Sequence, residues 1–131
     1  MESYGRGADD IENRFTDYIG VNNIPNLLAQ LDHGEKVIFS CIVIKVNKWG
    51  LNQDRTLLLT NRNLYNVKKE TVKRKIQINN IKALTLSSVQ GHNEFVVHIK
   101  SEYDYRYVSD YRREIFDACK YIWWKENHTN L

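Results

Sequence analysis

The sequence has few of the residues that cross-link small domains, restrict the backbone or bind metals. Its 131 residues include only two cysteines, Cys41 and Cys119, and one proline, Pro25. Each cysteine lies among apolar residues, which predicts two reduced core thiols of a cytosolic protein rather than a disulfide framework. The four histidines are scattered along the chain and do not form the cluster that a bound metal ion needs. We therefore expect no metal and no other cofactor.

Long hydrophobic runs and nucleotide-binding motifs are also missing. No apolar run reaches the roughly 18 residues of a membrane-spanning helix, and residues 1–10 lack the hydrophobic core of a signal peptide. No GxxxxGK[ST] phosphate-binding loop occurs. Acidic pairs such as Asp9/Asp10 and Glu102/Asp104 are not joined to a nucleophile and an orienting group. The sequence therefore predicts a protein that is not an enzyme.

Charge is strongly segregated along the chain, although the net charge is only +3. Residues 1–35 carry seven acids and two bases, whereas residues 41–82 carry ten bases and two acids. This excess of positive charge in the middle of the chain predicts an anionic partner: phospholipid, nucleic acid or an acidic protein. The alternative is a solvated basic face without a specific partner.

Aromatic and β-branched residues in the middle of the chain predict strands. Breaks containing Asn, Gly, Lys or Ser separate seven short segments: residues 36–46, 55–60, 63–69, 72–78, 81–87, 94–100 and 103–109. In the fourth segment, strict alternation would put Val72, Arg74 and Ile76 on one face and Lys73 and Lys75 on the other. No helical crossover fits between the segments, so the sheet should be antiparallel.

Helices are predicted before and after the strands. Apolar residues at helical spacing predict a helix over residues 8–19, and Pro25 starts a second over residues 25–31. A third, over residues 109–126, has Ser109 as its N-cap. Its buried face is predicted to contain Tyr111, Ile115, Ala118, Cys119 and Ile122.

These elements predict one mainly β (α+β) unit. Seven antiparallel strands form a barrel or sandwich, and the C-terminal helix caps it. Residues 36–131 make up this unit. Residues 1–35 are expected to form an acidic helical extension that packs on the barrel away from the basic hairpins, because an anionic bilayer would repel it.

Seven blocks of sequence follow one another from about Asp17 to Trp124. They are DYIG (17–20), NNIPNLL (22–28), GEKVIFS (34–40), DRTLLLTNRNLYNV (54–67), KRKIQINNIKALTLSS (73–88), EFVVHI (94–99) and YVSD…EIFDACKYI (107–122). The series resembles the tail homology 1 domain of class I myosins, a cytoskeletal motor family. The resemblance implies a pleckstrin-homology-like fold. It also implies a module that attaches its protein to anionic membranes through phosphoinositide head groups.

The resemblance also implies particular site residues. The family uses a Lys near the end of the first strand and an Arg that opens the second. Lys45 and Arg55 match these positions, and Lys48 matches a further basic position in the loop between them. The loop NKWGLNQD (47–54) departs from the family, because relatives are often more basic there. The chain begins with Met and holds no motor, which suggests a tail fragment or a free-standing tail-like protein.

Two basic hairpins make up the predicted phospholipid-binding surface. The first carries Lys45, Lys48 and Arg55, and the second carries Lys68, Lys69, Lys73, Arg74 and Lys75. If both hairpins open at the same end, their cations face one membrane. Each is then worth roughly 1 kcal/mol near an anionic surface. At the first tip, Trp49 and Leu51 are candidates for insertion among the head groups. The alternative is that Trp49 folds back on the barrel.

Nucleic acid and other proteins are the alternative partners to a membrane. Tyr103, Tyr105 and Tyr107 alternate on the last strand and could stack on single-stranded nucleic acid. The mixed charge of that strand favours a core or edge role, so no nucleic acid is expected. The alternative function is a protein–protein interaction module, an adaptor or scaffold that binds cytoskeletal or adaptor proteins through the sheet edge or the C-terminal helix. We expect a monomeric cytoplasmic protein, peripheral on the inner face of the plasma membrane or on internal membranes.

Overall fold

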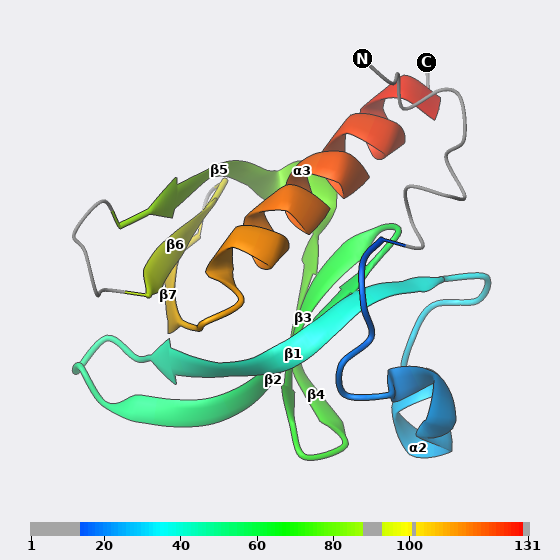
Figure 1. Cartoon of the computed structure of the whole chain (residues 1–131), viewed down its shortest axis with the longest axis horizontal. Coiled ribbons are helices and arrows are strands. Elements are labelled where there is room, and N and C mark those ends of the chain that lie inside the picture. The colour runs from blue at the N-terminus through cyan, green and yellow to red at the C-terminus, as the bar shows by residue number, and fades with distance from the viewer. Residues whose placement is uncertain (1–13, 88–92, 101, 130–131) are drawn as a thin grey trace.

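The computed structural model describes residues 14–87, 93–100 and 102–129. Seven strands form one sheet in the order β4-β3-β2-β1-β7-β6-β5 (Figure 1). They are β1 (Val37–Val46), β2 (Asn52–Thr60), β3 (Asn63–Lys68), β4 (Thr71–Gln77), β5 (Ile81–Leu86), β6 (Glu94–Ile99) and β7 (Tyr105–Val108). Every adjacent pair is antiparallel. The predicted seven-stranded antiparallel fold is confirmed, and β4 and β5 are its two edge strands.

The C-terminal helix α3 (Arg112–Thr129) packs against the curled sheet (Figure 1). The hydroxyl of Ser109 accepts a hydrogen bond from the backbone N–H of Tyr111 at 3.0 Å, just before the helix begins. Ile115, Ala118, Cys119 and Ile122 are buried, as their spacing predicts. We call the face of the sheet that packs on α3 the inner face. Among the described residues, no helix is both long enough and apolar enough to cross a membrane.

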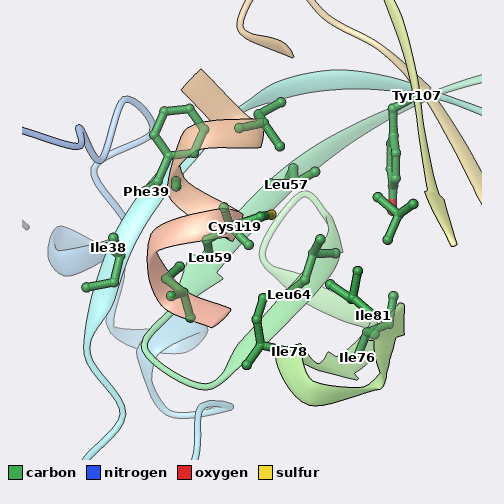
Figure 2. Packing of buried hydrophobic residues seen from close by; sticks show 14 of the residues in the cluster. Ile38, Phe39, Leu57, Leu59, Leu64, Ile76, Ile78, Ile81, Tyr107 and Cys119 are labelled. Carbon is green, nitrogen blue, oxygen red and sulfur yellow. The ribbon is translucent and has the colours of Figure 1, made fainter. Parts of the chain in front are cut away.

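The larger of two apolar clusters lies between the inner face and α3. Figure 2 shows Phe39, Leu57, Leu59, Tyr107 and Cys119 converging in it. Cys41 also lies there, and both cysteines are free and buried, as predicted. Burial raises the pKa of each thiol to about 12, so both stay protonated at neutral pH.

A smaller cluster covers the opposite, outer face of β2 and β3. Val21 lies in the 3-10 turn η1 (Val21–Asn23), and Leu27 lies in the short helix α2 (Pro25–Leu28). Both pack with Leu58, Tyr65 and Val67 of the sheet. The predicted helix from Pro25 is therefore present but ends at Leu28 rather than at residue 31.

The predicted helix over residues 8–19 is wrong where it can be compared, and residues 8–13 lie outside the described residues. Residues 14–19 form turns and an isolated parallel bridge between Asp17 and Ser40. The Asp17 carboxylate accepts hydrogen bonds from the backbone N–H groups of Val21 at 2.9 Å and Asn22 at 3.1 Å. Because an Asp side chain can replace helical hydrogen bonds in this way, a turn is favoured over a helix.

In residues 14–35, which we call the N-terminal segment, the part from Asn26 to Asp32 lies against the β3–β4 hairpin rather than away from the basic hairpins, whereas Phe15 and Tyr18 pack against α3 and β1. Asp32 forms an ion pair of 2.7 Å with Lys75. The side-chain amide of Gln30 donates to the Glu70 carbonyl at 2.7 Å and accepts from the Val72 N–H at 2.9 Å. The predicted position is wrong because an edge strand has open hydrogen-bonding groups, and this segment supplies partners for them. The division of the chain at residue 35 stays a prediction.

Hydrogen bonds to the Glu35 carboxylate connect the segment before β1 to the turn between β2 and β3. Glu35 accepts hydrogen bonds from the Tyr65 hydroxyl at 2.7 Å and the Asn63 side-chain amide at 2.9 Å. The Thr60 hydroxyl and the backbone N–H of Asp32 also donate to it. Burial opposes ionisation, but these hydrogen bonds outweigh it and hold the pKa of Glu35 below its ordinary value.

Candidate membrane-binding site

Three connections lie at one end of the sheet, which we call the loop end: residues 47–51, 69–70 and 102–104. Val46 at the end of β1 lies opposite both Asn52 of β2 and Arg106 of β7. Thr56 of β2 lies opposite Val67, so the start of β2 runs beside the end of β3. The two basic hairpins therefore open at the same end, although their tips point in different directions (Figure 1).

Lys45 and Arg55 are diagonal neighbours on the inner face at the loop end. Val43 lies opposite Arg55 and Lys45 lies opposite Gln53, and Val43 belongs to the inner core. Side chains two apart on a strand share a face, so Lys45 and Arg55 both follow Val43 on that face. Burial and the charge of Arg55 both lower the pKa of Lys45. Two cations are thus held together, and neither forms an ion pair within the described parts of the chain.

Arg74 reaches the same face from β4. Arg74 lies opposite Asn66 and two residues before Ile76, so both face inward, and a β-bulge at the step from Asn66 to Val67 leaves Lys73 without an opposite residue. Val72 packs instead with the outer cluster. The predicted strict alternation of this strand is therefore wrong, because the bulge shifts it by one residue.

Arg74 already forms side-chain contacts across the curled sheet, to the start of β7 and the loop before it. Its Nε donates to the Tyr105 hydroxyl at 2.9 Å, and its Nη2 forms an ion pair with Glu102. Glu102 precedes β7 and Tyr105 begins it, and both are far from β4 in sequence. Glu102 is a feature of the site that sequence reasoning missed, since no local pattern links it to Arg74.

The other cations of the second hairpin are spread over different surfaces. Lys69 lies in the two-residue turn with a left-handed φ of 57°, and Lys68 lies opposite Thr71. Lys73 is exposed, whereas Lys75 points to the outer face and pairs with Asp32. The predicted group from Lys68 to Lys75 therefore does not form one patch. Lys75 is on the outer face, whereas Arg74, together with Lys68 two residues after Asn66, is on the same face as Lys45 and Arg55.

The tip of the β1–β2 loop is exposed. Trp49 is 74% exposed and Leu51 is 62% exposed, so the alternative that Trp49 folds back on the barrel is wrong. The Asn47 side-chain oxygen accepts from the N–H groups of both residues, at 3.0 and 2.9 Å. The ammonium group of Lys48 lies 4.5 Å from the centre of the Trp49 ring. An apolar tip therefore stands next to cations at the loop end.

A hollow of about 560 Å3 lies beside this tip, between the end of β1 and the start of β7. Lys45 and Lys48 line one side, and Tyr103, Tyr105 and Arg106 line the other. The ammonium group of Lys45 lies 5.5 Å from the centre of the Tyr105 ring. Tyr105 is half-buried, as a core or edge residue should be, but Tyr103 precedes β7 and is 84% exposed. The volume of the hollow is within the range of small-molecule sites, and Asp104 also lines it.

Solved structures with this fold are pleckstrin homology domains, among others. The Slm1 pleckstrin homology domain in complex with D-myo-inositol-4-phosphate aligns with a TM-score of 0.56 and 14% identity, covering 66% of this chain and 95% of that one. The C-terminal domain of an unknown protein from Leishmania infantum aligns with a TM-score of 0.59 and 15% identity, covering 81% and 95%. At such low identity these similarities show the fold alone, which is pleckstrin-homology-like.

A family model described as "Unconventional myosin tail, actin- and lipid-binding" matches residues 6–129. The chain therefore belongs to the unconventional myosin tail family, as the resemblance implied. Human and mouse unconventional myosin-Id are 34% identical to it over 85 residues. That alignment covers 62% of this chain and only 8% of theirs. The family is a lipid-binding tail module rather than a catalytic domain.

Proposed function

We propose that the chain binds anionic phospholipid membranes and that Lys45 and Arg55 hold head-group phosphates. The observation that carries this proposal is the pairing of the two cations on the inner face at the loop end, with no carboxylate partner among the described residues. Arg55 can contact one phosphate through two parallel hydrogen bonds, and Lys45 can act as a point charge on another. An anion between them would also relieve their mutual repulsion.

The remaining cations supply a diffuse attraction. Lys48, Lys68, Lys69 and Lys73 are exposed around the loop end, and each is worth roughly 1 kcal/mol near an anionic surface. Lys75 contributes less than the sequence suggests because Asp32 partly neutralises it. The family's lipid-binding description supports this class of ligand. We accordingly place the protein in the cytoplasm, peripheral on the inner face of the plasma membrane or on internal membranes.

Sedimentation with liposomes tests the proposal. The protein should pellet with phosphatidylcholine vesicles that contain phosphatidylserine or a phosphoinositide, and should stay in solution with phosphatidylcholine alone. Raising the salt concentration should release the part of the binding that comes from exposed charge. Equal binding to neutral and acidic vesicles, or no binding to either, would contradict it.

Glu102→Gln is expected to strengthen vesicle binding about threefold to tenfold. Glu102 forms an ion pair with Arg74, and its own charge is repelled by an anionic surface. The change raises the net charge of the loop end by one unit, because the charge of Arg74 is no longer compensated, and one unit is worth roughly 1 kcal/mol near an anionic surface. Vesicle titration at fixed salt measures the affinity, with Asp117→Asn on the exposed side of α3 as the matched control. Unchanged or weaker binding would show that Arg74 does not reach lipid.

Trp49→Ala is expected to weaken vesicle binding about fivefold. An exposed indole gains free energy when it moves from water into the head-group layer. Lipids brominated near the glycerol backbone should quench tryptophan fluorescence in the unaltered protein and quench it less in the variant. Trp123→Ala, which removes an indole from α3, is the control and should keep both affinity and quenching. Full quenching in the Trp49 variant would exclude insertion of this tip.

A further inference from the structure

We propose that the groove between β5 and α3 binds an extended peptide that pairs with the free edge of β5. The peptide that fits has apolar residues at alternate positions and acidic residues at its ends. This is a second binding function, independent of the phospholipid site at the loop end.

The two edges of the sheet differ in how their backbone groups are satisfied. At the β4 edge, the Gln30 amide bonds to the Glu70 carbonyl and the Val72 N–H, as a paired strand would. That edge also carries Lys73, Arg74 and Lys75 in sequence. Charges and covering segments of this kind prevent an edge from pairing with another chain.

The β5 edge has much less of this protection. A register shift at its start, next to Lys82, disturbs pairing there. Residues 83–86, with the sequence ALTL, have no charged side chain. Within the described parts of the chain, no side chain bonds to their backbone. This stretch therefore keeps the alternating N–H and C=O groups to which an extended peptide can add.

The groove lies on the free side of this edge. It has a volume of about 380 Å3, and it is lined by residues of β5, of α3 and of the 3-10 turn η2 (Ile78–Asn80), whereas none of β6 lines it. Leu84 lies on the strand side, and Phe116 and Trp123 lie on the helix side. Trp123 is 46% exposed. A strand that pairs with β5 would point every second side chain toward these rings. Trp is among the residues that contribute most binding free energy when they are buried at interfaces.

Two lysines indicate the charge of the peptide. Lys82 on β5 and Lys120 on α3 line the groove, and both are exposed. Neither has an acidic partner among the described residues. A peptide with carboxylates beside its apolar residues would satisfy both the rings and the ammonium groups, whereas a basic peptide would be repelled. A bilayer could neutralise the lysines but could not supply backbone groups to β5, so the edge favours a peptide.

An array of synthetic peptides tests the proposal with the whole chain. Its members are about nine residues long, alternate varied apolar residues with Thr, and carry two acidic residues at each end. A second array has lysines at the ends. Fluorescence anisotropy then measures affinity for the best members, and for versions methylated on alternate backbone nitrogens. Acidic peptides should bind, and either lysine ends or N-methylation on the pairing side should weaken binding at least tenfold.

Variants separate this groove from the phospholipid site. Trp123→Ala and Lys120→Glu should each weaken peptide binding about tenfold and leave vesicle binding unchanged, which also shows that they fold. Arg55→Ala should do the reverse. The proposal is overturned if no acidic peptide binds, or if binding survives both N-methylation and Trp123→Ala. It is also overturned if the groove proves to be covered by a second copy, seen as a concentration-dependent dimer that Trp123→Ala abolishes.

Discussion

Arg55→Ala and Lys45→Ala should each weaken binding to phosphoinositide vesicles by tenfold or more, whereas Lys73→Ala should cost only about fivefold. A lost hydrogen bond to a charged group costs about 1.5–3 kcal/mol, and Arg55 and Lys45 are placed to make such bonds together. Lys73 is exposed on the second hairpin and contributes only its share of the surface potential, roughly 1 kcal/mol.

Salt concentration distinguishes the two kinds of loss. The contribution of Lys73 should nearly vanish at high salt, while the losses at Arg55 and Lys45 should persist because direct phosphate contacts are screened less. Titrating vesicles at two salt concentrations measures this. None of the three changes should move the melting temperature much, since exposed charges stabilise folds weakly. Equal losses for all three variants, erased together by salt, would mean that only a diffuse basic surface exists.

Glu35→Ala should lower the free energy of unfolding by about 3–4 kcal/mol, the largest effect on stability that we predict. The Glu35 carboxylate accepts from Thr60, Asn63 and Tyr65, all of which are buried. Truncation would leave these donors without their acceptor, and an unsatisfied buried donor costs about 1–3 kcal/mol. Urea unfolding followed by circular dichroism measures the change. Asp117→Ala, at an exposed position on α3, is the control and should change stability little.

The same carboxylate should make stability depend on pH on the acidic side. Its folded-state pKa is lowered, so the folded state favours the ionised form. The stabilisation is fully present above the ordinary pKa of Glu and is lost as the pH falls through the lowered value. Glu35→Gln keeps the shape but not the charge, so the difference in stability between it and the unaltered protein should shrink as the solution is acidified. A constant difference would contradict the assignment.

The order and type of the strands were predictable because they depend on local pattern. The β-branched run from Val37 to Val46 forms one long strand, and the buried face of α3 contains the residues that its spacing indicates. Predictions failed where a hydrogen bond or a shift in strand register overrode the local pattern. The Asp17 carboxylate replaces helical hydrogen bonds near residue 19, and a bulge at β4 moves Val72 to the outer face.

The candidate site was only partly predictable. Lys45 and Arg55 could be named because they match positions of a known family, and the hairpin register brings them to one face. The group from Lys68 to Lys75 could not be resolved, because its members depend on distant partners. Glu102 binds Arg74, and Asp32 binds Lys75. Such contacts join residues far apart in sequence, and no local periodicity encodes them.

Taken alone, the sequence determined that this is a mainly β member of the unconventional myosin tail family with an excess of cations in its central strands. Composition, periodicity and block order are local properties, and they suffice for that. Tertiary structure decided which cations are available. Glu102 and Asp32 come from other parts of the chain and form ion pairs with Arg74 and Lys75, whereas Lys45 and Arg55 have no such partner among the described residues. Tertiary structure also decided that Gln30 closes the β4 edge while residues 83–86 of β5 stay open, since only the curled sheet shows which strands lack a neighbour.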